Sequence, residues 1–327
     1  MFHAKFKAPS YYKDFRCKGA DCRNCCCQGW KVTLTQEEYF KVMNLDCSKD
    51  LKEKMDAYVG ILSHPNDKEY ARINFDFQGQ CPLRLNNGYC GLQVECGEEN
   101  IPSVCRYYPR SPKLNPFPEC CISNSCEWVL EYLYENDVWN FEFLPLSFAF
   151  DDDEKKEDFP SDYQEKRNFY LTLFLKNASF LSKVEVLLHN GIVFDHIKEE
   201  IILKKLRDAF SRSISISSLL ENLDGEIPSF SSLFETLKGY YPNLDGILSR
   251  ILLNHLFYAK FPFVTSFQNK REECSCLYFL IYFWLWILKG NLKKKDKDDF
   301  VDISASFFRV AEHSNLYDII DFFVKKS

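Results

Sequence analysis

The stretch CKGADCRNCCCQGW, residues 17 to 30, places five cysteines within eleven positions, three of them consecutive. The chain has 15 cysteines, and 13 of them lie between Cys17 and Cys126. The odd count, together with an N-terminus that lacks the apolar run of a signal peptide, argues against a disulfide framework and predicts a cytoplasmic protein. Thiols that stay reduced and lie close together generally bind a soft metal, so this segment predicts a metal site in the N-terminal half.

The local spacing limits how the first cysteines can act. On a helix, Cys22, Cys25 and Cys26 would share one face, whereas in an extended chain Cys25 and Cys27 would share a face and Cys26 would oppose them. The run cannot direct all its thiols to one point in either conformation. We therefore expect at least one of them to support the ligands or to serve another site.

A second pair of cysteines lies in CPLRLNNGYCGL, residues 81 to 92. A two-residue turn at Asn87 and Gly88 would pair Leu85 with Cys90 in a short β-hairpin and put Cys81 about 13 Å along the ribbon from Cys90. Both thiols reach one site only if the chain bends at Pro82 or if a larger cluster lies between them. Otherwise the two cysteines serve different sites.

Four further cysteines, Cys47, Cys96, Cys274 and Cys276, are interpreted as core fillers, because free cysteine is among the most buried residue types. The spacing of the others leaves the metal open. No C-x2-C pair is followed by a second pair at zinc-ribbon spacing, and the radical-cofactor triad C-x3-C-x2-C is missing because position 29 is glycine. Zinc and an iron–sulfur cluster both remain possible from spacing alone.

The rest of the chain has a different pattern. A charged stretch, DDDEKKED at 151 to 158, separates a predicted cysteine-rich, metal-binding domain at 1–150 from a predicted α-helical domain at 160–327. The predicted fold is mainly α, with a loop-rich N-terminal half and one short β-hairpin packed on C-terminal helices. Amphipathic spacing predicts helices at 167 to 191, 196 to 211, 215 to 223, 230 to 239, 244 to 260, 273 to 289 and 298 to 325.

Charge and hydropathy exclude two classes of partner. The formal net charge is −6. Lys plus Arg numbers 17 against 20 acidic residues in 1–150, and 24 against 27 in 151–327. Neither half has the excess of positive charge with which proteins bind nucleic acid. The most apolar segment, LYFLIYFWLWIL at 277 to 288, is shorter than the roughly 20 residues that span a bilayer, so it predicts a core helix and no membrane span.

The order of four motifs carries a family resemblance. YKDFRCKGADCRNCCCQGWKV, GQCPLRLNNGYCGLQ, CRYYPR and ECCISNSCEW follow one another as they do in the flagellin lysine N-methylase family, and more distantly resemble the shorter cysteine-rich zinc/iron-chelating domains. LLNHLFYAKFPF and RVAEHSNLYDIIDFF continue the resemblance through the second half. Glu127 and Trp128 follow the last cysteine where the family usually has Pro and Glu, and Cys25 and Cys121 are additional, so the last motif departs from the pattern.

The resemblance implies an S-adenosylmethionine-dependent protein-lysine N-methyltransferase that acts on flagellin and holds an iron–sulfur cluster of the 4Fe-4S kind. The family's cysteines fall, residue by residue, on Cys17, Cys22, Cys26, Cys27, Cys81, Cys90, Cys105 and Cys126. No two glycines are spaced as G-x-G, so a Rossmann-like donor site is not expected.

Trp30, Tyr108, Pro109 and Arg110 fall on the family's other motif positions. We expect Tyr108 and Arg110 in a catalytic role, because aromatic faces attract ammonium and a phenol can take its proton. Arg106 and Trp30 are expected to contact the cofactor, since guanidinium pairs with carboxylate or sulfide. Ordinary turn packing for CRYYPR and core packing for Trp30 are the alternatives. The six histidines show no paired ligand spacing and are expected to face solvent or to form hydrogen bonds in the core.

A second hypothesis needs no catalysis. One or two zinc ions would staple the loop-rich half, since structural zinc contributes folding free energy directly, and the surface would recruit a protein partner. A third, a redox or metal-handling protein, would use the additional thiols of Cys25 and Cys121.

Overall fold

A computed structural model describes residues 2–23, 25–28, 32–137, 139–148, 159–213, 216–223 and 225–326, without the side chain of Phe2. It divides into two compact units, Arg16–Pro109 and the remainder, Met1–Phe15 with Arg110–Ser327. We call them the cysteine unit and the helical unit. The division into domains at 1–150 and 160–327 stays a prediction, and the charged stretch 151–158 lies outside the described residues.

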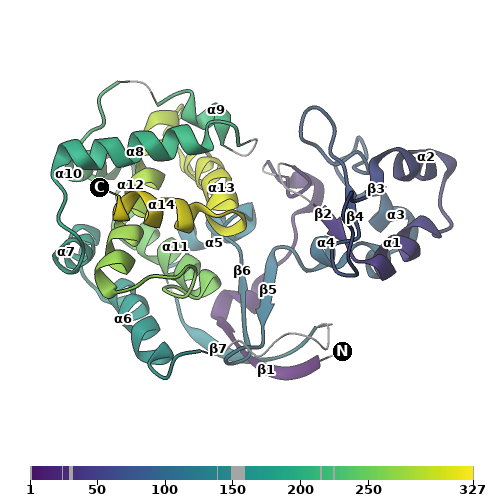
Figure 1. Cartoon of the computed structure of the whole chain (residues 1–327), viewed down its shortest axis with the longest axis horizontal. Helices are drawn as coiled ribbons and strands as arrows, with labels where there is room; N and C mark the ends of the chain where they lie inside the picture. Colours follow the sequence, from purple (N-terminus) through teal and green to yellow (C-terminus); the bar gives the residue numbers. More distant parts are fainter. Residues whose placement is uncertain are drawn as a thin grey trace. The chain divides into compact units, whose positions relative to one another are not determined.

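The mainly α fold is confirmed, because helices form most of the described chain (Figure 1). In the helical unit they are α5 (Glu127–Glu135), α6 (Tyr163–Leu175), α7 (Phe180–Asn190), α8 (His196–Phe210), α9 (Ser217–Leu220), α10 (Phe230–Tyr240), α11 (Leu244–Ala259), α12 (Lys270–Asn291), α13 (Lys297–His313) and α14 (Leu316–Lys325).

Two of the predicted helices are each divided into two. The segment 167 to 191 breaks after α6, where Lys176 leaves the helical region and the Ser179 hydroxyl caps α7 by accepting from the Ser182 amide. The segment 298 to 325 breaks at Ser314, which adopts an extended conformation between α13 and α14. Periodicity alone could not find these breaks, because the apolar spacing continues across both.

Helix α12 is the core of the helical unit. Its 22 residues have the length and apolar composition of a membrane-crossing helix, yet 89% of its most apolar window is buried within the protein. It packs against α7, α10, α13 and α14, and the Trp284 indole donates to Ser304 at 3.1 Å while stacking on Phe307. A helix that is apolar all round belongs in a core, and the prediction of a core helix here is confirmed.

A four-stranded sheet lies in the same unit. Its order is β5 (Arg110–Lys113), β6 (Glu119–Ile122), β1 (Phe2–Pro9) and β7 (Phe141–Phe148), with β1 parallel to β6 and the other pairs antiparallel. A short 3₁₀ turn, η1 (Ser10–Asp14), follows β1. Within the described residues the sheets have no doubly wound, parallel arrangement, which agrees with the missing glycine-rich turn.

The cysteine unit has a small core between a sheet and short helices. The sheet, β2-β4-β3, is antiparallel throughout. Buried Val32, Leu34, Met55, Ile73 and Leu92 contribute to its core. The elements are η2 (Gly19–Asp21), β2 (Val32–Leu34), α1 (Gln36–Met43), α2 (Lys49–Tyr58), β3 (Val59–Ile61), β4 (Ala71–Ile73), α3 (Gly91–Cys96), η3 (Glu98–Asn100) and α4 (Ser103–Tyr107).

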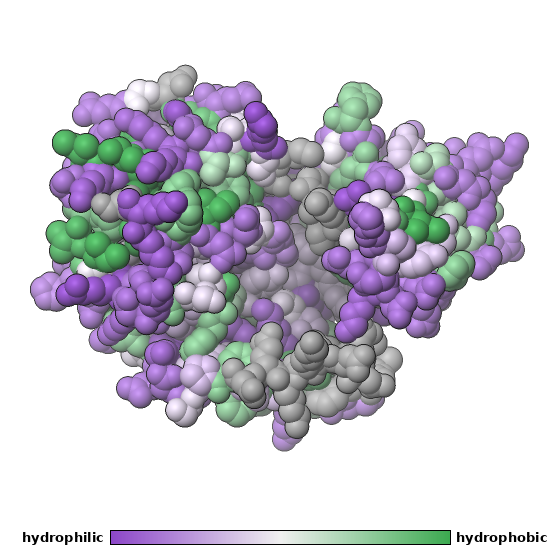
Figure 2. Space-filling model, viewed as in Figure 1, coloured by the Kyte–Doolittle hydropathy of each residue, from purple (hydrophilic) through white to green (hydrophobic). Residues whose placement is uncertain are grey.

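The visible surface of the helical unit is mostly hydrophilic, with apolar patches interrupted by polar side chains (Figure 2). On α8, Ile197 is 72% and Ile201 43% exposed, and Phe322 on α14 is 50% exposed. Isolated apolar residues of this kind are normal on a protein surface.

Candidate functional site

The short helix α4, which bears Cys105 and Arg106, is fixed by one carboxylate. Thr35 and Glu38 form a capping box at the start of α1, with the Glu38 amide donating to the Thr35 hydroxyl at 3.2 Å. One carboxylate oxygen of Glu38 accepts from the Thr35 amide at 3.0 Å, and the other accepts from the amide of Ser103, in the first turn of α4, at 2.6 Å. The same side chain therefore starts one helix and anchors another.

The segment with consecutive cysteines is attached to the segment that begins with Cys81. Gln28 and Gln80 form an antiparallel bridge, and the Cys81 amide donates to the Cys27 carbonyl at 2.9 Å. Cys26 and Cys27 lie in a turn, so this part of the run is neither the helix nor the strand that the spacing allowed. The pairing brings two distant groups of thiols to one place.

The predicted hairpin between Cys81 and Cys90 is wrong in register. Arg84, not Leu85, bridges Cys90, and the Gly88 amide donates to the Leu85 carbonyl at 2.9 Å, so the central turn residues are Asn86 and Asn87. Gly88 follows with φ +89°, and a Cβ there would lie 3.0 Å from that of Ala20. A turn followed by a glycine at positive φ forms a longer loop than the two-residue turn expected from the sequence.

The chain bends at Pro82, which is one of the two arrangements that would let Cys81 and Cys90 reach the same site. The Arg84 amide donates to the Cys81 carbonyl at 3.1 Å and closes a turn, and the Gly91 amide donates to the Leu83 carbonyl at 2.8 Å. Cys81 and Cys90 are then close enough for the charge of Cys90 to act on Cys81, whose pKa burial raises to about 11. The two thiols can serve one site.

The adjacent thiols of Cys25, Cys26 and Cys27 shift one another's pKa through hydrogen bonds. Hydrogen bonds from the Cys26 and Cys27 thiols lower the pKa of Cys25, with a smaller contribution from the nearby Arg84 guanidinium. The Cys27 amide also donates to the Cys25 sulfur at 3.3 Å. In turn, the hydrogen bonds to Cys25 raise the pKa of Cys26 and of Cys27. A thiolate is therefore stabilised at Cys25, the position that the family resemblance left out.

Two further thiols of the unit, Cys105 and Cys17, interact electrostatically with this group. Burial raises the pKa of Cys105, and the neighbouring charges of Cys90, Cys81 and Cys26 raise it further. Cys17 acts in the same way on Cys26, and its own sulfur accepts from the Gly19 amide at 3.4 Å. The charges of cysteines from residues 17–27, 81–90 and 105 thus influence one another.

Such a donor set fits a soft metal or an iron–sulfur cluster. Thiolates are soft ligands, and backbone amides that donate to sulfur stabilise the thiolate form. In the parts of the chain that are described, no three Cys, His, Asp or Glu side chains are arranged as ligands of one ion. No disulfide joins any cysteine, which agrees with the expectation from the sequence.

The predicted site residues belong to different parts of the chain. Cys126 is the residue before α5 in the helical unit, whereas the other seven predicted cysteine ligands lie in the cysteine unit. Cys22 ends η2 and is partly buried. Trp30 lies outside the described residues. The full ligand set stays a prediction.

The arginines and tyrosines of CRYYPR are divided between the two units. The Arg106 guanidinium stacks on Tyr107 with 5.0 Å to the ring centroid, while Tyr108 ends α4 and is partly buried. Arg110 belongs to the helical unit, pairs with Ile122 across β5 and β6, and stacks on Phe15 at 4.8 Å. The catalytic roles of Tyr108 and Arg110 and the cofactor role of Arg106 stay predictions.

The cysteines interpreted as core fillers differ among themselves. Cys274 and Cys276 on α12 are fully buried, as expected. Cys47 and Cys96 are only partly buried. Burial raises the pKa of Cys96, and the neighbouring Cys47 raises it further. Cys121 is buried beside Asn254, and burial raises its pKa well above the usual range, so it is an unreactive thiol.

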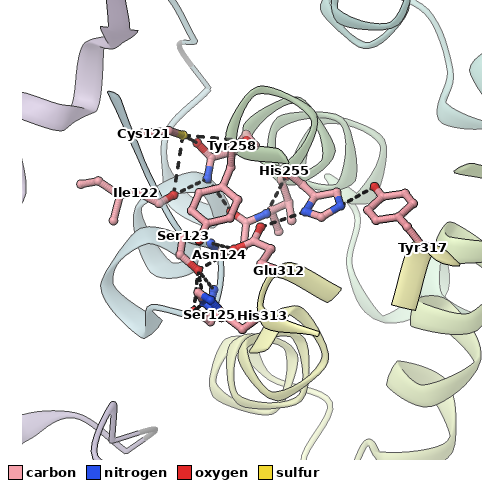
Figure 3. A network of polar contacts seen from close by, with 12 residues as sticks. Cys121, Ile122, Ser123, Asn124, Ser125, His255, Tyr258, Glu312, His313 and Tyr317 are labelled. Carbon is pink, nitrogen blue, oxygen red and sulfur yellow. Dashed lines mark hydrogen bonds and ion pairs between the residues drawn. The ribbon is translucent and has the colours of Figure 1, made fainter. Parts of the chain in front are cut away.

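A second cluster, which sequence reasoning did not find as a site, lies in the helical unit (Figure 3). Its centre is Glu312 near the end of α13, whose side chain is fully buried. One carboxylate oxygen accepts from the Ser123 hydroxyl at 2.5 Å and from the Asn124 amide at 2.9 Å. The other lies 2.9 Å from Nδ1 of His255 on α11.

Both ends of this cluster continue through further polar groups. Nε2 of His255 lies 2.6 Å from the Tyr317 hydroxyl on α14, and the two rings are stacked. At the other end, Nε2 of His313 lies 3.2 Å from the Ser123 hydroxyl and 3.0 Å from that of Ser125. We call these residues the Glu312 network: Ser123, Asn124, Ser125, His255, Glu312, His313 and Tyr317.

Side-chain amides of Asn254 and Asn124 hold the segment that carries the two serines against α11. Asn254 on α11 donates to the Asn124 side-chain oxygen at 2.6 Å and to the Ile122 carbonyl at 2.9 Å, and Asn124 donates to the Ile251 carbonyl at 2.9 Å. His255 is the hydrogen-bonded core histidine that the sequence allowed, whereas His313 is exposed. The signal for this cluster was the motif order, because its residues come from ECCISNSCEW, LLNHLFYAKFPF and RVAEHSNLYDIIDFF.

Comparison with known proteins defines the class. The family described as "FliB lysine N-methylase C-terminal domain" matches residues 149–326, more than half of the chain. The chain therefore belongs to the FliB lysine N-methylase family. No solved structure matches it.

Curated relatives match over a shorter stretch. The "Lysine-N-methylase" proteins of Salmonella choleraesuis and Salmonella typhimurium are each 30% identical over 105 residues, which is 32% of this chain and 25% of theirs. The "Flagellar biosynthetic protein FliU" of Salmonella muenchen is 29% identical over 105 residues and is covered to 60% of its length.

Proposed function

We propose that this protein is a protein-lysine N-methyltransferase that transfers methyl groups from S-adenosylmethionine to lysine side chains of flagellin. The observation that carries the proposal is the family match over residues 149–326. The names of the relatives support it, since two are lysine N-methylases and one is a flagellar biosynthetic protein. Flagellin would be modified in the cytoplasm, before export.

The thiols of the cysteine unit are the proposed holders of an iron–sulfur cluster of the 4Fe-4S kind. Cys17, Cys22, Cys26, Cys27, Cys81, Cys90, Cys105 and Cys126 are the candidate ligands. Cys25, whose sulfur accepts from the Cys27 amide at 3.3 Å, joins them as a further candidate. When bound, such a cluster supplies redox chemistry or a rigid anionic centre beside which a cationic sulfonium can bind.

The methyl donor needs a site of another kind than the glycine-rich turn. The described sheets are antiparallel or mixed, and the chain has no G-x-G sequence. Guanidinium groups recognise carboxylates in a bidentate manner, which makes Arg106 a candidate for the amino-acid end of the donor. Trp30 is a candidate for stacking on its adenine.

The direct test is methyl transfer by the whole chain, purified without air, with flagellin from the same cell and S-adenosylmethionine labelled in the methyl group. The proposal predicts label in flagellin as methylated lysine, identified by mass spectrometry of tryptic peptides. Flagellin whose lysines are blocked by prior acetylation is the control and should stay unlabelled. Absence of transfer, together with stoichiometric zinc and specific capture of a partner, would favour the alternative of a zinc-stapled binding module.

A further inference from the structure

Hydrogen-bonding groups lead from the surface into the helical unit at His313. The residue is exposed, but Nε2 of its ring faces the Ser123 and Ser125 hydroxyls, both of which are fully buried. The two hydroxyls lie 2.5 Å apart, and the Ser123 hydroxyl contacts Glu312 at the same distance (Figure 3). Each step is a short contact between groups that can pass a proton.

The inner end of this path is held rigidly. Glu312 also accepts from the Asn124 amide, and its second oxygen is paired with His255, which is in turn bonded to Tyr317. A carboxylate with three partners and no solvent contact has one orientation, and so does the hydroxyl that donates to it. A hydrogen-bond network that only stabilised the fold would not require an exposed histidine at one end.

The state of the imidazole suits a proton acceptor. Burial of the ring against its neighbours lowers the pKa of His313, more than the charge of Glu312 raises it, and the Arg309 guanidinium lowers it further. The ring of Tyr258 lies edge-on at 6.1 Å. The lowered pKa favours the neutral imidazole, which is the form that can accept a proton.

The other ionisable groups nearby are unsuited to that role. Burial raises the pKa of the Tyr258 phenol and of the Cys121 thiol, so both stay protonated and cannot accept. Glu312 is fully covered and cannot touch a substrate. Of the described groups in and around the Glu312 network, His313 alone combines exposure with a neutral basic nitrogen.

We propose that His313 is the general base that takes a proton from the substrate lysine, with Ser125, Ser123 and Glu312 positioning its ring. The proposal rests on the proposed methyltransferase function. A lysine ε-amine is protonated at neutral pH and has no lone pair for attack until it loses a proton.

The step balances as follows. The ammonium N–H bond breaks and the proton passes to the imidazole, leaving the nitrogen lone pair free. That pair attacks the methyl carbon of the sulfonium donor, a C–N bond forms, and the S–C bond breaks with its electron pair on sulfur. The imidazolium is a stronger acid than the ammonium, so it releases the proton readily to water at the exposed side of His313, and the imidazole can act again for the next methyl group.

The test compares His313→Gln with His189→Gln, a matched change at an exposed histidine on α7 in the same unit. We expect His313→Gln to lower kcat for methylation of flagellin about 10²-fold or more, with KM for flagellin and affinity for S-adenosylmethionine unchanged, and added imidazole to restore part of the rate. His189→Gln should behave as wild type. Ser125→Ala, which leaves the imidazole but removes its inner partner, should lower kcat by about tenfold.

The outcomes separate the two proposals. Wild-type turnover with equal kcat in His313→Gln and Ser125→Ala overturns the assignment of the base and leaves the methyltransferase proposal standing. A rise in KM with unchanged kcat also overturns it, because it shows a binding role. No transfer by the wild type overturns both proposals together.

Discussion

Replacing Glu312 with alanine tests how the helical unit joins its three motif segments. The change removes one buried carboxylate and with it contacts to Ser123, Asn124 and His255 at 2.5, 2.9 and 2.9 Å. It leaves the Asn124 amide and the His255 ring without their acceptor in a site closed to water. A buried donor that loses its partner costs about 1–3 kcal/mol, and three groups share this one carboxylate.

We therefore expect Glu312→Ala to lower the free energy of unfolding by about 3–5 kcal/mol, less than the sum of the separate bonds because they share one acceptor. Glu312→Gln keeps the shape and an acceptor oxygen and should cost about 1–2 kcal/mol. Urea unfolding followed by circular dichroism measures both. With a slope of about 2 kcal/mol per molar, the midpoint of the alanine variant should fall by about 1.5–2.5 M.

The control is Glu185→Ala, which removes an exposed carboxylate on α7 and should change stability by less than about 0.5 kcal/mol. A loss below about 1 kcal/mol for Glu312→Ala would refute the reasoning, because it would mean that the carboxylate does not join β6, α11 and α13.

Three further changes test other parts of the account. Arg167→Met breaks the ion pair between Arg167 and Glu119, in which the two side chains are only 2% and 7% exposed, and should lower the free energy of unfolding in urea by about 3–5 kcal/mol. The control, Lys166→Met at the exposed pair with Asp162, should lower it by less than about 0.5 kcal/mol, and equal effects of the two changes would contradict a stabilising buried pair. For Asp245, burial opposes ionisation, but hydrogen bonds from the Phe180 amide and Lys238 lower its pKa overall. Its contribution is thus present above the unfolded pKa and lost as pH falls through the folded one, so Asp245→Asn should cost about 1 kcal/mol at pH 7 and nothing near pH 2, and a loss independent of pH would be evidence against it. Cys105→Ser should reduce bound metal while Cys96→Ser leaves it unchanged, as measured by elemental analysis; equal retention would remove Cys105 from the ligand set.

Much of the helical unit could be predicted from its apolar spacing. Apolar side chains that recur every three or four positions form one buried face of a helix, whichever elements that face packs against. For this reason α8, α10, α11 and α12 lie close to their predicted positions. The breaks before Phe180 and Leu316 could not be predicted, because capping by Ser179 and the extended Ser314 are local events that leave the apolar pattern unchanged.

The functional residues were harder to predict because they depend on contacts between distant segments. The collection of thiols followed from composition and chemistry, but the register at Cys90 depended on the positive φ of Gly88. The Glu312 network was not visible, since Ser123 and His313 are 190 positions apart and neither has a ligand-like or catalytic spacing. The family's motif order was the one sequence signal that connected them.

The central claim is that thiols of the cysteine unit hold an iron–sulfur cluster. Iron and acid-labile sulfide in the whole chain, purified without air, test it most directly. The account predicts about four iron and four sulfide per chain, with a brown protein whose visible absorbance bleaches on reduction. A colourless protein that contains zinc, or no metal at all, would contradict it.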